Sequence, residues 1–446
     1  MHEVMQRWFD RHAAELVQVS RTLWERPEAS EQEHFACRTL SGLMAEHGFT
    51  VAALPPAGLD TAFEASWGSG APHIGFLAEY DALPGLSQET SPRPEPIPGQ
   101  AFGHGCGHNL LGTGAAGAAI ALRAVMEAEG LPGTVYLYGC PSEEVMMGKI
   151  IMTQAHVFDH LDAAISWHPG DRNRASEESY QAMLSMEYHF TGKASHASMA
   201  PQEGLSALDA VELMDVGVNY LREHVPPGGQ IHYVILNGGE KPNIVPEKAS
   251  VWQFIRANTA ADLRRIAARM DDIAAGAALM TGTSYTKKIV TGCNETKIVP
   301  ALVDVMHQVM TQEVMPPVWS PEEEAFSRRL LESLELRVPE HPLHGGVSAP
   351  KGETIDILGS SDLSDVSYVV PTCMLFSACY PMGTPNHTWA VTACAGHSIG
   401  QKGMLYAARV MAAIGLRLTR DPVLRQAVRT SFQEALGETR YAPVNI

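Results

Sequence analysis

The chain has 446 residues, of which 45% are hydrophobic, and a formal net charge of −18 at pH 7. A chain of this length exceeds what one hydrophobic core usually supports, so we expect two domains. The negative charge argues against nucleic acid as a partner, and it requires a local basic group wherever an acidic substrate binds.

The N-terminal residues and the cysteines indicate in which cellular compartment the protein is expected. The first residues are charged throughout, unlike a secretory signal, and the uncharged part of the weakly polar run 109–126 is too short to span a bilayer. Seven cysteines, an odd number, fit a reducing compartment in which thiols are free or bound to metal. We therefore expect a cytoplasmic protein with no membrane partner.

The first half of the chain alternates between helical and strand patterns, starting with two amphipathic helices in residues 1–50. The later apolar runs end in residues that can bind a metal. These are, in chain order, Glu79 and Asp81, the motif GHGCGHN at 103–109, the pair Glu143 and Glu144, and His168. Polar residues at the carboxyl ends of strands collect along one edge of an α/β sheet. We therefore expect these groups to converge.

From about Met183 the pattern changes to strand, helix, strand, strand, helix, strand. This order is that of the ferredoxin-like split unit. We predict an inserted α+β domain at 183–295, which divides an α/β catalytic domain into residues 1–182 and 296–446. The catalytic domain is expected to have helices around a mainly parallel sheet.

Cys106 and His108 lie two residues apart in GHGCGHN, with glycines on both sides. A thiolate and an imidazole together suit zinc or a similar divalent ion. The glycines let the backbone turn so that both side chains face one point. Taken alone, the motif fits a glycine-rich turn around a buried thiol equally well.

The adjacent carboxylates Glu143 and Glu144 strengthen the metal interpretation, because apolar runs lie on both sides of them. An acidic pair in apolar surroundings is costly unless a cation neutralises it. One carboxylate can bind a metal while the other stays free as a base. His168 and His387 have similar settings, each after an apolar run and beside a proline-containing turn.

Eight segments together resemble the glutamate carboxypeptidase/aminoacylase family of dinuclear metallohydrolases. In chain order they are GFLAEYDALPG, GHGCGHNLLGTGAAG, YGCPSEE, SWHPGD, GKASHAS, NIVP, DLSDVS and GTPNHTW…SIGQKGM. Within that family the sequence is most similar to the amidohydrolase branch that contains the B-type chain of p-aminobenzoyl-glutamate hydrolase, and beyond it to the indole-acetyl-amino-acid hydrolases. The resemblance covers nearly the whole chain.

The resemblance implies two divalent metal ions per chain, zinc or manganese. Five residues match its metal ligands: Cys106 as the bridging ligand, His108, Glu144, His168 and His387. Glu143 matches the general base that takes a proton from the attacking water. Asp81 matches the acid that orients a ligand from behind.

The resemblance also assigns roles within the inserted domain. His196 matches a histidine that stabilises the oxyanion, in relatives usually from the partner protomer, so a homodimer through this domain is implied. Asn243 matches a substrate-binding amide, and Arg256 is a candidate clamp for the substrate carboxylate.

The implied reaction is hydrolysis of the C–N bond of a small N-acyl amino acid, or of an aryl amide bearing a carboxylate. Val145, Met146 and Met147 follow the glutamate pair where relatives usually have small glycine-rich residues. They would narrow the pocket and make it more apolar. Two alternatives stay open: hydrolytic deamination of an activated aromatic amine by the same machinery, and a catalytically silent binding protein that keeps the fold.

Overall fold

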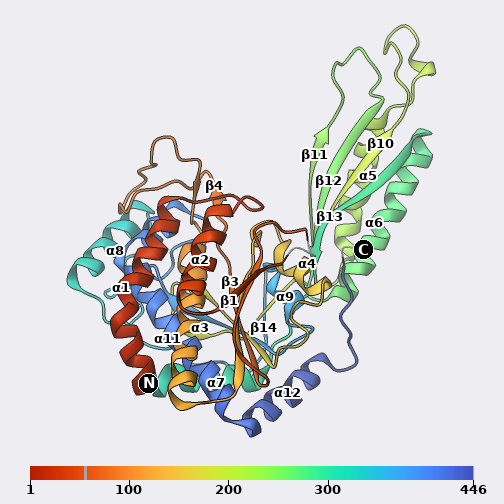
Figure 1. Cartoon of the computed structure of the whole chain (residues 1–446). Helices are drawn as coiled ribbons and strands as arrows, with labels where there is room; N and C mark the ends of the chain where they lie inside the picture. The colour runs from red at the N-terminus through yellow and green to blue at the C-terminus, as the bar shows by residue number, and fades with distance from the viewer. Residues whose placement is uncertain (55–57, 445–446) are drawn as a thin grey trace. The chain divides into compact units, whose positions relative to one another are not determined.

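The computed structural model describes residues 1–54 and 58–444, which form two compact units (Figure 1). The first unit comprises residues 1–177, 297–354 and 366–440. The second contains the predicted insertion, residues 183–295, and extends over 178–296. It also includes two segments that were expected in the catalytic domain, 355–365 and 441–444. The first of these joins the second unit because its strand pairs there.

A seven-stranded sheet forms the centre of the first unit. Its strands, in spatial order, are β1 (Thr50–Ala53), β2 (Phe63–Ser69), β6 (Gly133–Gly139), β3 (His73–Ala78), β7 (Ala163–Gly170), β15 (Thr372–Ala378) and β8 (Arg174–Ala175). The four strands from β6 to β15 are parallel, as expected, whereas β1, β2 and β8 pair antiparallel to their neighbours. The sheet is therefore mixed, with a parallel centre and antiparallel edges.

Helices surround this sheet, as expected. They are α1 (Glu3–Glu25), α2 (His34–Glu46), α3 (His108–Glu129), α4 (Gly148–Gln154), α7 (Pro300–Gln312), α8 (Pro321–Ser333), α10 (Trp389–Gly396), α11 (Ser398–Arg420) and α12 (Pro422–Leu436). Helix α3 packs against α1, α11 and the strands β3, β6 and β7. It is long and apolar enough to cross a membrane, but 89% of its apolar window is buried inside the unit. It is the central helix of this core.

Shorter elements complete the first unit. The strands β4 (Leu83–Pro84) and β5 (Phe102–Gly103) pair antiparallel and close the proline-rich loop between them. This pairing holds the start of the GHGCGHN motif. The hairpin formed by β1 and β2 was not anticipated from the sequence.

The second unit has a four-stranded antiparallel sheet in the order β11, β12, β10, β13. These strands are β10 (Ala182–Thr191), β11 (Gln230–Asn237), β12 (Lys248–Ala257) and β13 (Ser284–Cys293). The helices α5 (Ala207–Leu221) and α6 (Ala260–Thr281) pack against each other and on the strands. The chain order and the sheet order are those of the ferredoxin-like fold, which confirms that prediction.

Two further strands and one short helix lie at the margin of the second unit. Strand β14 (Ile355–Ile357) pairs parallel with β9 (Glu178–Tyr180), and α9 (Leu363–Val366) follows shortly after. The edge strand β11 leaves Val234, Ile235 and Leu236 about half exposed. An apolar edge of this kind is a surface suited to pairing with another strand.

Candidate metal centre

The parallel strands of the first unit carry the predicted donors to one edge of the sheet. Glu79 and Asp81 follow β3, the glutamate pair follows β6, and His168 lies near the end of β7. Because β6, β3, β7 and β15 run in the same direction, their carboxyl ends meet. The loop after β15 brings His387 to the same edge, where its backbone N–H donates to the carbonyl of Gly105 at 3.2 Å.

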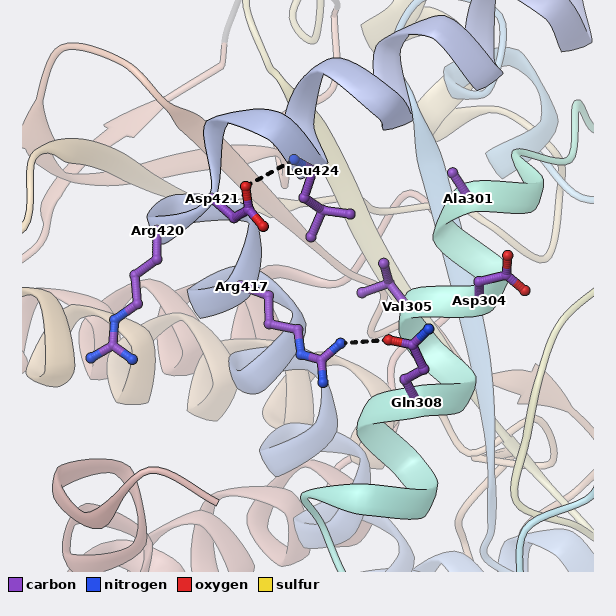
Figure 2. A pocket seen from close by; sticks show the side chains of 8 residues that line it. All are labelled: Ala301, Asp304, Val305, Gln308, Arg417, Arg420, Asp421 and Leu424. Carbon is purple, nitrogen blue, oxygen red and sulfur yellow. Dashed lines mark hydrogen bonds between the residues drawn. The ribbon is translucent and has the colours of Figure 1, made fainter.

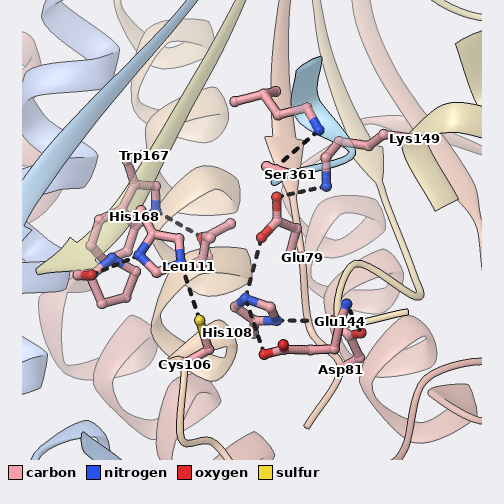
Figure 3. A network of polar contacts seen from close by, with 12 residues as sticks. Glu79, Asp81, Cys106, His108, Leu111, Glu144, Lys149, Trp167, His168 and Ser361 are labelled. Atoms are coloured by element: carbon pink, nitrogen blue, oxygen red, sulfur yellow. Dashed lines mark hydrogen bonds and ion pairs between the residues drawn. The ribbon is translucent and has the colours of Figure 1, made fainter. Parts of the chain in front are cut away.

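The glycines of the GHGCGHN motif allow a close approach to β7. Gly107 has a φ of 78° and precedes α3, and a Cβ there would lie 2.9 Å from Cγ of Pro169. A side chain at this position would therefore push the loop away from the strand. With glycine in place, the Cys106 sulfur lies 3.2 Å from Nε2 of His168 (Figure 3).

Hydrogen bonds fix the orientation of the buried imidazole of His108 and the half-buried imidazole of His168. Nδ1 of His108 lies 2.9 Å from the Asp81 carboxylate, and Nδ1 of His168 lies 2.7 Å from the carbonyl of Pro169. A neutral imidazole donates its proton in such a bond, so its other nitrogen keeps a lone pair. In both residues this other nitrogen, Nε2, faces the remaining donors.

Asp81 holds three groups at once. Besides His108, it accepts a hydrogen bond from the backbone N–H of Glu144 at 2.9 Å and one from the hydroxyl of Ser30 at 2.8 Å. Its side chain is fully buried. Burial raises the pKa of this carboxyl, but its hydrogen bonds and the neighbouring His108 lower the pKa by a larger amount. The net effect is a pKa below the usual value. Asp81 is therefore an anion that positions two other members of the site.

The donor atoms gather in three overlapping groups, within each of which they lie no more than 4.8 Å apart. The groups are Cys106, His108 and His168; Cys106, Glu144 and His387; and Glu79, His108 and Glu143. The first two groups share the thiol. One sulfur between two sets of nitrogen and oxygen donors is an arrangement that could hold two divalent ions side by side.

The chemistry of these groups fits a cation. Nε2 of His108 and Oε1 of Glu144 are buried, and neither has a hydrogen-bond partner among the described residues. Burial raises the pKa of the Cys106 thiol, and it raises the pKa of Glu144 to about 7. Burial also lowers the pKa of His168 to about 4, so its imidazole is neutral. A bound cation would neutralise the anions and use the orphaned lone pairs.

A buried ion pair next to this centre was not anticipated from the sequence. Lys149 on α4 is fully buried, and its Nζ lies 2.7 Å from Oε1 of Glu79 (Figure 3). The second oxygen of Glu79 lies 3.4 Å from Nε2 of His108. Burial raises the pKa of Glu79, but the charge of Lys149 and its hydrogen bond outweigh this effect and lower the pKa. The available signal was a lysine inside the apolar segment VMMGKIIM.

The loop that carries the glutamate pair has an unusual backbone. Ser142 and Met146 have positive φ angles of 60° and 58°, and His387 has one of 56°. Left-handed conformations are uncommon for residues other than glycine and are concentrated at functional sites. Val145 is 39% exposed in this loop, whereas Met146 and Met147 are half-buried.

The other three predicted residues belong to the second unit. His196 and Asn243 are exposed on loops that pair with each other, since Ala197 N–H donates to the carbonyl of Asn243 at 3.0 Å. Arg256 lies on β12, half-buried, with its guanidinium 4.7 Å from the centre of the Phe254 ring. The structure thus gathers the predicted donors of the first unit and places the substrate-binding candidates on the second.

A cavity of about 480 Å³ in the first unit contains none of the predicted residues (Figure 2). It is lined by α7, the end of α11 and the start of α12. Its two arginines already have acidic partners, Glu313 for Arg417 and Glu129 for Arg420. Among the described residues that line it, the cavity therefore has no unpaired cation with which to recognise an anion.

The fold and the donor set define a class, an α/β metallohydrolase unit with an appended ferredoxin-like unit. Residues 181–279 match the family described as the peptidase dimerisation domain. The chain is 37% identical to the B-type chain of p-aminobenzoyl-glutamate hydrolase from Escherichia coli over 95% of this chain and 93% of that protein. It is 30% identical to the Xaa-Arg dipeptidase of Mus musculus over 96% of this chain and 91% of that one. The chain belongs to the family of these hydrolases, the M20 family, which confirms the resemblance seen in its motifs.

A solved structure supports the fold assignment. A dinuclear metal binding peptidase of the M20 family from Bacillus subtilis superposes with a TM-score of 0.58, covering 91% of this chain and 99% of that one. The sequence identity between the two is 16%, so the likeness concerns the fold.

Proposed function

We propose that this protein is a metal-dependent amidohydrolase that cleaves the C–N bond of a small N-acyl amino acid or of an aryl amide bearing a carboxylate. As a member of the M20 family it is a hydrolase of C–N bonds. The proposal rests on one observation above all. Two groups of donor atoms share the Cys106 sulfur, and the Glu143 carboxylate lies within 4.8 Å of the donor atoms of Glu79 and His108. Both named relatives act on amides formed with an amino acid.

We propose two divalent ions per chain, with Cys106, His108, Glu144, His168 and His387 as their ligands. The thiol and the three imidazoles favour zinc over manganese, which prefers oxygen donors. The dinuclear centre named for the Bacillus subtilis peptidase supports the number of ions. When bound, such ions polarise a carbonyl oxygen and lower the pKa of water.

The residues of the chain supply the remaining chemistry. Glu143 takes a proton from the attacking water at a carboxylate oxygen as the water oxygen bonds to the carbonyl carbon. It then delivers this proton to the amine nitrogen as the C–N bond breaks. Asp81 keeps the backbone of Glu144 and the ring of His108 in place during both steps. His196, Asn243 and Arg256 are proposed to contact the oxyanion, the amide and the carboxylate of the substrate.

The residues after the glutamate pair favour an apolar acyl group. Val145, Met146 and Met147 have flexible or branched apolar side chains, which fill space that glycines would leave open. We propose that they border the acyl side of the pocket. The p-aminobenzoyl group named for the bacterial relative is therefore one candidate among several apolar acyl groups.

The test is a panel of N-acyl amino acids and aryl amides with the zinc- or manganese-loaded protein and its Glu143→Gln variant. Glutamine is nearly isosteric but cannot accept the proton, so we expect kcat to fall roughly 10²–10⁴-fold. The metal content, measured by elemental analysis, should stay unchanged. In the matched variants Glu144→Gln and Cys106→Ala the metal content should fall. Loss of metal from Glu143→Gln with retention in Glu144→Gln would reverse the two roles.

We also propose that the second unit forms a homodimer and that the protein works in the cytoplasm. The match to the peptidase dimerisation domain and the apolar edge strand β11 support the dimer. The bacterial relatives carry names for two different types of chain, which leaves room for a second type here as well.

A further inference from the structure

A second cluster of metal-binding side chains lies in the first unit and shares no residue with the metal centre. It consists of His12, Glu15 and His47, whose donor atoms lie within 4.8 Å of one another. Nδ1 of His12 is 2.7 Å from one oxygen of Glu15, and Nε2 of His47 is 3.2 Å from both oxygens. Two imidazoles thus converge on one carboxylate.

The local fold explains this convergence. His12 and Glu15 are three residues apart on α1, so both side chains project from the same face of the helix. His47 follows the last turn of α2, where its backbone N–H bonds to the carbonyl groups of that turn. The guanidinium of Arg123 donates to the carbonyl oxygen of His47. Hydrogen bonds therefore fix both the N–H and the carbonyl of His47, which supplies the third side chain.

Packing also holds the rings in place. The Trp8 ring stacks on His12 with their centres 4.8 Å apart and their planes inclined by 16°. The His12 and His47 rings meet edge to face at 5.2 Å. The side chains are 33%, 35% and 15% exposed for His12, Glu15 and His47, so the cluster is mostly buried but open to solvent in part. A ligand set that is ordered before a metal arrives loses little freedom on binding.

The donor chemistry is that of a transition metal. Two imidazoles and one carboxylate form a common set around zinc in proteins, with water in the open position. Neutral imidazoles and an ionised carboxylate are the forms that bind metal.

We propose that His12, Glu15 and His47 form an additional site for a borderline divalent cation such as zinc, separate from the hydrolytic centre. The cation would replace the three nitrogen–oxygen contacts to Glu15 with three metal–ligand bonds. It would connect the N-terminal helix α1 to the end of α2. The inference stands independently of the proposed reaction, because it uses none of the residues of that reaction.

The experiment is equilibrium dialysis of the full chain against zinc, with elemental analysis of the bound metal. We expect Glu15→Gln and His47→Gln each to bind one zinc fewer per chain than the unchanged protein, at a zinc concentration that saturates the latter. Loss of a group that only supports a ligand weakens binding roughly 10–100-fold, so loss of a ligand should weaken it at least about 100-fold. Hydrolysis of any substrate that the unchanged protein accepts should continue at the same rate in these variants.

The matched control is His156→Gln. Nδ1 of His156 lies 2.7 Å from the carboxylate of Asp159 three residues later, which repeats the contact between His12 and Glu15 without a second histidine. Its zinc content should equal that of the unchanged protein. Equal zinc contents in Glu15→Gln, His47→Gln and the unchanged protein would overturn the proposal, since the cluster would then be a hydrogen-bonded network only. If one variant fails to fold, the other and His12→Gln provide the same test.

Discussion

Several charged side chains are buried in the first unit, where each interacts with a partner that offsets the cost of its burial. Asp81, Glu79 and Lys149 are all buried, and each has an oppositely charged or hydrogen-bonding partner. A charge in this position is tolerated only as long as its partner remains. The stability of the unit should therefore depend on residues that take no direct part in the proposed reaction.

Replacement of Lys149 by methionine tests this dependence. Lys149→Met leaves Glu79 buried without its cation, and we expect the free energy of unfolding to fall by about 3–5 kcal/mol. In the double variant with Glu79→Gln the total loss should be much smaller than the sum of the two single losses. Urea unfolding followed by circular dichroism measures all three values.

Lys287 offers a control, because its Nζ lies at the same 2.7 Å from Asp271, but the two side chains are 30% and 37% exposed. Lys287→Met should cost no more than about 1 kcal/mol. Additive losses in the Glu79 and Lys149 cycle would show that the two charges do not stabilise each other.

For individual residues, the sequence points to candidate metal ligands more readily than to the residues that hold such ligands in place. Cys106, His108 and the glutamate pair stand out because their residue types recur at the ends of apolar runs. Lys149 does not, because a single lysine in a helical segment is usually solvated, and only the fold shows that it points at Glu79. The His12, Glu15 and His47 cluster was missed for a related reason: its third member is distant in sequence.

Among the secondary-structure elements, α3 packs closely against the strand β7, which carries the proposed ligand His168. It starts at His108, and its glycines let neighbouring side chains approach its backbone. A Cβ on Gly114 would lie 2.9 Å from Cζ2 and Nε1 of Trp167. This indole is fully buried and donates to the carbonyl of Leu111 at 2.9 Å. The next residue along β7 is His168, so the helix and the strand are fitted together beside a proposed ligand.

Gly114→Ala should therefore destabilise the protein although alanine favours helices. Overpacking of a rigid core typically costs about 1–3 kcal/mol, more than the roughly 0.5–1 kcal/mol that alanine gains over glycine. The matched control is Gly42→Ala in α2, where an added Cβ meets nothing within 4 Å. This variant should be more stable by the full helix gain. Thermal unfolding measures the midpoint temperature of both variants. Equal shifts of this temperature in the same direction would contradict the packing argument.

The elements themselves were predictable where the apolar period was clear and local. The ferredoxin-like order appears in the sequence because each of its strands and helices is long and amphipathic. The hairpin of β1 and β2 was missed because short runs and glycines obscure its pattern. The antiparallel edges of the central sheet, and the pairing of β14 with β9, result from contacts between distant segments that no local pattern records.

At the scale of the whole molecule, the proposed dimer leads to a testable prediction about His196. If His196 acts on the metal centre of the partner, the variants His196→Ala and Glu143→Ala are each inactive. After statistical exchange of protomers, half of the dimers would be mixed, each with one intact site. Activity should then return to roughly a quarter of the original. Light scattering checks the dimer, and a label on one variant checks the exchange.

Recovery requires exchange, so a mixture of Glu143→Ala with Glu143→Gln is the control and should stay inactive. Demonstrated exchange without recovery would mean that His196 acts within its own chain or has no role in the reaction. The sequence could suggest this arrangement only through its resemblance to relatives, because the contacts of a dimer leave no periodic pattern in a single chain.

The spread of the proposed ligands along the chain sets an order for its biosynthesis. Cys106, His108, Glu144 and His168 are made more than 200 residues before His387 and the helix α11, which packs on α3. Until α11 has been made, part of the apolar surface of α3 has no cover, so the core of the first unit cannot close. The complete set of proposed ligands exists only after His387 has been made. If these residues bind metal as proposed, complete loading of both ions is expected only after His387 has been made.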